Sequence, residues 1–238
     1  MSSRALARFL AHGAGAASAV ILLALVAAAL AAPLVAGAMG HDPFAPDLFN
    51  RFQPPSGTHP LGTDELGRDL LLRLLYGARV SLAVGLAAAL ASAAIGLAIG
   101  LAAAWFGGVI DAVLMRLADG LLALPALPLL IVLAAVDPAQ LGLPRDVAAL
   151  DLIRIVVIIA LFGWVKVARI TRGAALAILR MDYARAAIAL GASAPRLLWR
   201  HVPPNLAAHV AGATTLTVGN AILVESVLSF LGLRIQPP

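Results

Sequence analysis

Long apolar segments alternate with short polar ones along the whole of this 238-residue chain. A bilayer core about 30 Å thick is crossed by about 20 apolar helical residues. By that criterion we expect five membrane-spanning helices, at residues 13–40, about 80–104, about 112–136, about 150–179 and about 204–231, the third of them interrupted by Pro125 and Pro128. The fourth has a charge-free centre at 155–165 only, so it requires Arg154 and Lys166 to reach opposite interfaces. The pattern predicts an all-α, polytopic helical membrane protein.

The polar segment at residues 41–79 is rich in proline and acidic residues, and we expect an ordered extramembrane loop with a short helix. Within it, Thr63-Asp64-Glu65 is typical of a helix start, because a capping residue is followed by acids. The next segment, 80–110, carries no charge and contains several small residues, among them Gly96 and Gly100. Such residues allow helices to pack closely inside a membrane.

Composition supports a membrane protein. Hydrophobic residue types make up 62% of the chain and charged types 12%, whereas soluble domains have about 45–50% and about 25%. These values exclude a typical soluble enzyme, a disordered chain and a nucleic-acid-binding domain. The chain has no cysteine, its five histidines show no ligand spacing, and it has no Walker-type phosphate loop. We therefore expect no catalytic residues, no cofactor and no metal site.

The charge distribution predicts the orientation in the membrane. Between Lys166 and Arg200 there are seven basic residues and one acid, Asp182. Because basic residues collect on the cytoplasmic side, this segment is expected in the cytoplasm, together with the N-terminus. The loop at 41–79 is then extracytoplasmic.

The cytoplasmic segment is predicted to form a compact helix–turn–helix elbow. Residues 182–190 suit a short helix that Gly191 can end in the left-handed conformation. Ser193 can cap a second short helix with Pro195 in its first turn. Such an elbow either docks a soluble partner or is a basic loop that only sets topology.

This elbow resembles the EAA loop of ABC-importer permeases, with Ala186, Ala187, Gly191 and Pro204 at matching places. It departs from that pattern at Arg185, where the family has Glu, and at Pro203, where it has Leu. The resemblance implies a coupling helix that docks on an ATPase subunit. The residues assigned to this coupling loop are Tyr183, Arg185, Ala186, Ala187, Gly191, Ala192, Ser193 and Pro204.

Two further segments resemble one subfamily, the C-type permease subunits of dipeptide, oligopeptide and nickel importers. The first runs from His59 to Leu82 and contains the runs Leu-Gly-Thr-Asp and Leu-Gly-Arg-Asp. The second runs from Ala221 to Leu233 and is followed by Gln-Pro-Pro. That family has six spans and continues beyond the Gln-Pro-Pro turn. Because this sequence stops at Pro238, we expect a chain that lacks the sixth span.

The resemblance implies half of the translocation pore of an ATP-driven importer for peptides or related small solutes, in a bacterial inner membrane. Expected partners are a homologous B-type permease, two cytoplasmic ATPase subunits and an extracytoplasmic solute-binding protein, with no nucleic acid. The implied division is a cytoplasmic N-terminus at 1–12, a first span at 13–40, the loop at 41–79 and a core permease domain at 80–238 with its coupling loop at 180–203. The alternative is a non-transporting scaffold or assembly subunit, and a membrane-embedded enzyme is less well supported.

One acid within the last apolar segment has a second interpretation. Glu225 is the only acid between residues 202 and 233, and at a rise of about 1.5 Å per residue it lies about 31 Å from Pro204, near the outer interface. Arg79 lies at the outer start of the second span, at similar depth. The two either form an ion pair at an outer gate or are hydrated separately.

Overall fold

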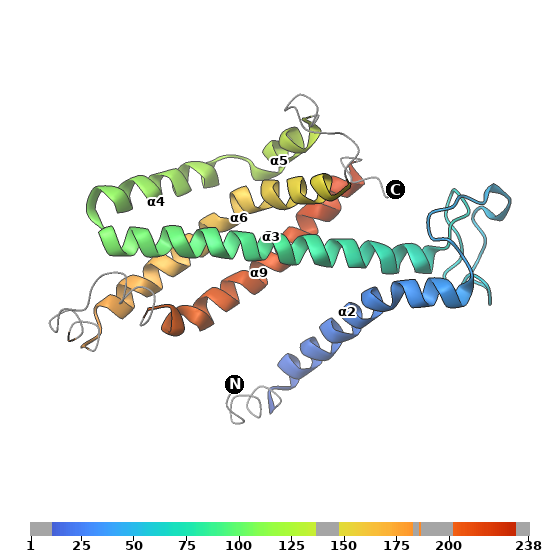
Figure 1. Ribbon diagram of the computed structural model, residues 1–238, viewed down its shortest axis with the longest axis horizontal. Coiled ribbons are helices and arrows are strands. Elements are labelled where there is room, and N and C mark those ends of the chain that lie inside the picture. The colour runs from blue at the N-terminus through green and yellow to red at the C-terminus, as the bar shows by residue number, and fades with distance from the viewer. Residues whose placement is uncertain (1–10, 137–147, 183–185, 187–201, 232–238) are drawn as a thin grey trace. The chain divides into compact units, whose positions relative to one another are not determined.

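The computed structural model describes residues 11–136, 148–182, 186 and 202–231 (Figure 1). Regular structure in these residues is helical, apart from one isolated β-bridge between Thr63 and Asp69, so the expected all-α class is confirmed. The chain divides into two compact units, Met1–Ala83 and Val84–Pro238. The boundary between the units falls within helix α3 (Leu70–Phe106).

In the first unit, helix α2 (Gly13–Met39) leads into an irregular loop that contains the 3-10 turn η1 (Leu48–Asn50). Helix α2 ends at Gly40, whose φ of 68° is the left-handed conformation that favours glycine. Apolar side chains cover its surface, and Leu34 is 76% exposed. A helix with an apolar, exposed surface along its length is suited to contact with lipid.

Helix α3 begins at Leu70, so the helix start predicted at Thr63 is wrong. Asp69 provides the cap instead, because its Oδ1 accepts a hydrogen bond from the backbone N–H of Leu72 at 2.9 Å. A carboxylate at this position also opposes the positive end of the helix dipole. Thr63 lies in the β-bridge to Asp69 and is 4% exposed.

The residues between Thr63 and Asp69 form a turn that requires glycine. Gly67 has a φ of 75° and its N–H donates to the carbonyl of Asp64 at 3.0 Å. A Cβ atom at Gly67 would collide with the backbone carbonyl of Asp47. The turn is therefore incompatible with a side chain at this residue, both in conformation and in space.

In the second unit, the predicted third span is broken into two helices, α4 (Gly108–Ala123) and α5 (Ala126–Ala135), with an angle of 85° between them. The break lies at Leu124 and Pro125, whose backbones are extended. Proline disfavours the helical conformation of the residue before it and cannot donate a backbone hydrogen bond. Pro125 and Pro128 in the sequence indicate an interruption of this span, and the structure places the break at Pro125.

Among the described residues of the second unit, helix α6 (Ala148–Leu179) packs against α3, α4, α5 and α9 (Val202–Phe230) (Figure 1). Four clusters of buried apolar side chains all include residues of α6. The α6 members of these clusters are Ile155, Ile158, Ile159, Trp164, Val165, Ala168, Ala175 and Ile178. The helix with the most basic residues among those described is thus the centre of this bundle.

Small residues allow α3 and α6 to approach closely, as the sequence predicts. A Cβ atom added to Gly96 would lie 2.7 Å from the carbonyl oxygen of Trp164, and one added to Gly100 would lie 2.5 Å from that of Ala168. Distances below 3.0 Å leave no room for a methyl group against backbone atoms. The backbones of α3 and α6 are therefore nearly in contact at Gly96 and Gly100.

Among the described residues, α2, α3 and residues 206–230 of α9 are long and apolar enough to cross a membrane, and the bent pair α4–α5 makes a fourth candidate. Helix α6 is not among the candidates found in these residues. Its crossing, and with it the count of five spans and the proposed domain division, stays a prediction.

Candidate functional site

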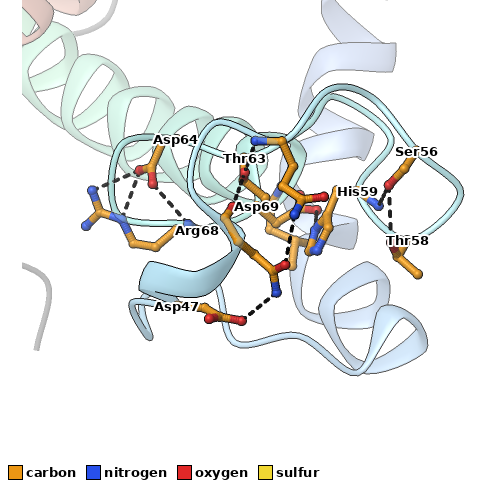
Figure 2. A network of polar contacts seen from close by, with 11 residues as sticks. Asp47, Ser56, Thr58, His59, Thr63, Asp64, Arg68 and Asp69 are labelled. Carbon is orange, nitrogen blue, oxygen red and sulfur yellow. Dashed lines mark hydrogen bonds and ion pairs between the residues drawn. The ribbon is translucent and has the colours of Figure 1, made fainter.

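In the first unit, the loop between α2 and α3 is held by a network of polar contacts (Figure 2). Thr63 is at its centre: its hydroxyl donates to the carbonyl of Asn50 at 2.5 Å and accepts from the N–H of Gln53 at 2.8 Å. Gln53 in turn accepts from the backbone N–H of Thr63 at 3.1 Å. These contacts join residues far apart in the loop, so hydrogen bonds between the loop's own residues hold its shape.

Asp64 organises the adjoining turn and accepts four hydrogen bonds. Its Oδ1 accepts from the N–H groups of Leu66 and Arg68 at 2.8 and 2.9 Å, and its Oδ2 accepts from the guanidinium groups of Arg68 and Arg73. Figure 2 shows the contacts between Asp64 and Arg68. Burial raises the pKa of this carboxyl, but the hydrogen bonds from the backbone of Arg68 and Leu66 and from both arginines outweigh that effect. The pKa of Asp64 is therefore below its ordinary value, and the carboxylate stays ionised.

A second cluster in this loop brings together three possible metal ligands. His59 Nδ1 lies 2.9 Å from Oδ2 of Asp69, whose side chain is 1% exposed (Figure 2). The His41 ring stacks on that of His59, with ring centroids 4.7 Å apart. One ligand atom from each of the three residues lies within 4.8 Å of the others. Sequence spacing did not indicate this cluster, because the three residues are separated by long, irregular segments.

In the second unit, one exposed and one partly exposed arginine of α6 are paired with acids of α4. Arg172 donates to both carboxylate oxygens of Asp111 at 2.5 Å, and Arg169 forms an ion pair with Asp119. In the sequence, this pairing is indicated by two acids spaced eight residues apart on one helix and two arginines spaced three residues apart on another. Residues at such spacings share one helix face, so the pairing could have been found.

Arg154 binds the end of a neighbouring helix. Its guanidinium donates to the carbonyls of Leu133 at 3.2 Å and Ala134 at 2.5 Å, and also to that of Val136. These are carbonyls at the end of α5 that have no partner within the helix. The expected place of this side chain at a membrane interface stays a prediction.

A cavity of about 260 Å³ lies beside the break between α4 and α5. Its walls come from α4, α5, α6 and α9, and they are mostly apolar. The polar groups at this cavity are contributed by Lys166, Thr217 and Asn220. A cavity of this kind, apolar with a few polar groups, is suited to bind part of a small organic solute.

Most of the predicted coupling loop lies outside the described residues: Tyr183, Arg185, Ala187, Gly191, Ala192 and Ser193. Ala186 is described and exposed, and Pro204 lies in the first turn of α9. Of the predicted outer-gate pair, Arg79 is exposed in the first unit and Glu225 is 8% exposed in the second. The roles assigned to these residues from the sequence stay predictions.

Long apolar helices around a central, charge-paired helix define a multi-pass helical membrane protein. The chain belongs to the family of binding-protein-dependent transport system inner membrane components, whose profile matches residues 94–237. A second profile, the N-terminal transmembrane domain of oligopeptide transport permease C, matches residues 1–55. The family resemblance inferred from the sequence is confirmed, and members of this family are transport permease subunits rather than enzymes.

Curated relatives agree with this assignment. The chain is 36% identical to the oligopeptide transport system permease protein OppC of Bacillus subtilis, over 92% of this chain and 67% of that protein. It is 39% identical to the dipeptide transport system permease protein DppC of the same organism, over 92% of this chain and 64% of that protein. The chain is 36% identical to the oligopeptide transport system permease protein OppC of Mycobacterium bovis, over 97% of this chain and 75% of that protein. The chain thus spans about two thirds to three quarters of the length of these relatives.

Proposed function

We propose that this chain is a permease subunit of an ATP-driven importer for peptides or related small solutes, and that it forms half of the translocation pore. The support is the family assignment together with relatives whose names specify oligopeptide and dipeptide transport. Its partners in this proposal are a B-type permease, two cytoplasmic ATPase subunits and an extracytoplasmic solute-binding protein. The N-terminus and the segment at 180–203 lie in the cytoplasm, and the loop at 41–79 faces outward.

The observation that carries the coupling part of this proposal is the packing of α6 against α9. The predicted elbow connects the end of α6 to the start of α9. At those ends Ala175 and Ile178 of α6 pack with Leu206 of α9, and Leu101 of α3 completes the same buried cluster. A movement of the elbow therefore acts on side chains that are already packed together.

The same two helices are also packed at their other ends. Ile155 and Ile159 of α6 lie with Ala221 of α9, and Ile158 lies with Leu228. Close packing at both ends makes the two helices move as one body, because packed interiors transmit displacement rather than absorb it. An ATPase that displaces the elbow would thereby displace α6 and α9 beside the cavity.

The test uses Gly191, where the sequence predicts a left-handed helix end that a β-branched residue opposes. We expect Gly191→Val to accumulate in the membrane at normal levels but to lose peptide uptake and co-purification with the ATPases. The matched control is Gly13→Val, because a side chain at Gly13 meets nothing within 4 Å. Uptake would be measured with a radiolabelled dipeptide in cells that express all subunits. Normal uptake by Gly191→Val would remove the elbow as the docking element, and no uptake by the unaltered complex would contradict the transport function itself.

A further inference from the structure

His41, His59 and Asp69 occupy three defined places in the first unit. His41 follows the glycine that ends α2, and Asp69 caps the start of α3. His59 lies in the loop between them, where its backbone N–H donates to Ser56 Oγ at 3.0 Å. The cluster therefore joins the exit of one helix to the entry of the next.

The burial of these side chains is unusual for an extramembrane loop. Asp69 is 3% exposed, and the His59 side chain is 16% exposed. Nδ1 of His41 is buried and has no hydrogen-bond partner among the described residues. A buried polar atom without a partner is costly and is rare in folded proteins, so this nitrogen requires an explanation.

A metal ion accounts for it. Two imidazoles and a carboxylate are the ligand types of Zn²⁺ sites with three protein ligands and one open position. Zinc–ligand distances of about 2.0–2.2 Å in a tetrahedron place neighbouring ligand atoms about 3.3 Å apart. Here His59 Nδ1 and Asp69 Oδ2 are 2.9 Å apart, and the three ligand atoms lie within 4.8 Å of one another.

Only a small movement is needed to bring the three ligand atoms around one ion, and His41 is the residue that can make it. Because the two rings are stacked at an angle of 20°, one ring must turn for both nitrogens to point at a single ion. His41 can do so, since its Nδ1 has no hydrogen bond to break. His59 and Asp69 have to separate by only a few tenths of an ångström.

We propose that His41, His59 and Asp69 bind a divalent transition-metal ion of the Zn²⁺ type, with the fourth position open to water. The ion would cross-link the end of α2 to the start of α3. Such a link stabilises the loop by an amount that rises with the logarithm of the metal concentration above the dissociation constant, because the unfolded chain does not hold the three ligands together. This site is separate from the coupling loop and from the cavity, so it is independent of the proposed transport function.

The test is isothermal titration calorimetry, in which ZnCl₂ is titrated into the purified chain in detergent. The chain carries an affinity tag without histidine and is first freed of metal with a chelator. We expect one Zn²⁺ per chain and a rise in melting temperature on addition of the ion. With Co²⁺ as the probe we expect the visible absorption bands of a four-coordinate nitrogen–oxygen site.

The decisive variant is His41→Gln, which leaves the hydrogen bonds of His59 and Asp69 in place. We expect its Zn²⁺ affinity to fall at least about tenfold, with an unchanged melting temperature in chelator. The matched control, His209→Gln, removes an exposed histidine of α9 and should bind as the unaltered chain does. Absence of saturable Zn²⁺ binding by the unaltered chain, or equal affinity in His41→Gln, would overturn the proposal and leave His59–Asp69 as a structural pair.

Discussion

A methyl group at Gly96 tests the contact between α3 and α6. In Gly96→Ala, the new Cβ would lie 2.6 Å from Cβ of Val167, 2.7 Å from the carbonyl oxygen of Trp164 and 2.9 Å from the backbone nitrogen of Ala168. Two of these atoms belong to the backbone of α6 and cannot rotate away. The helices must therefore separate locally, and overpacking of this kind costs about 1–3 kcal/mol.

The packing cost of Gly96→Ala can be separated from the helix propensity of alanine by a comparison with a second glycine. Gly120 lies within α4, and a Cβ atom there meets nothing within 4 Å. Alanine is favoured over glycine in a helix interior by about 0.8–1.0 kcal/mol, and this gain applies to both variants. The difference between Gly96→Ala and Gly120→Ala therefore reports the packing cost alone, and we expect it to be about 1–3 kcal/mol.

The assay is reversible unfolding in mixed micelles by increasing the fraction of a denaturing detergent, followed by circular dichroism. Gly96→Ala should unfold at a clearly lower fraction than Gly120→Ala. If Gly96→Ala does not accumulate in the membrane while Gly120→Ala does, the result has the same meaning. Equal stability of the two variants, within about 0.5 kcal/mol, would refute the close approach of the helices.

Three further predictions concern the polar residues. Because the pKa of Asp64 is below its ordinary value in the folded loop, its contribution to stability is present above the unfolded pKa of about 3.9 and is lost as the pH falls through the folded pKa; Asp64→Asn should remove this part of the acid sensitivity in thermal melts at pH 2–5. In intact cells, an impermeant thiol reagent should label Ser56→Cys but not Ser193→Cys, and labelling of the latter would reverse the predicted orientation. If Arg79 and Glu225 form the proposed ion pair, a double-mutant cycle of Arg79→Gln and Glu225→Gln should show coupling, whereas effects additive within about 0.3–0.5 kcal/mol would contradict it.

The helical segments follow from the sequence because bilayer thickness leaves few alternatives. The apolar segment predicted at 13–40 is α2, Gly13–Met39, and the one at 204–231 lies within about two residues of α9, Val202–Phe230. Helix starts were less predictable. The start was expected at Thr63, but the carboxylate of Asp69 is the group that accepts from a free N–H of the first turn, that of Leu72. Local sequence does not show this, because tertiary contacts hold Thr63 in a bridge to Asp69.

The sequence indicates an interruption of the third span at Pro125 and Pro128, but not which proline bends the chain. Both are tolerated in membrane helices when neighbours satisfy the freed carbonyls, and the sequence alone does not show whether they do. In the structure the chain bends at Pro125, and Arg154 binds the carbonyls at the far end of the short helix α5. Arg154 is about twenty residues away in the sequence, so local patterns do not contain this interaction.

The charges of α6 are paired with groups on its neighbours. A charged residue that stands alone in the membrane is costly. The cost of a charge falls when an opposite charge or a carbonyl group is fixed beside it. Arg154 meets carbonyl groups, and Arg169 and Arg172 each meet an acid of α4. The helix that looks least suited to a membrane can therefore be the centre of the bundle, provided that α4 and α5 assemble with it, and this dependence ties the stability of α6 to the bent helix pair beside the cavity.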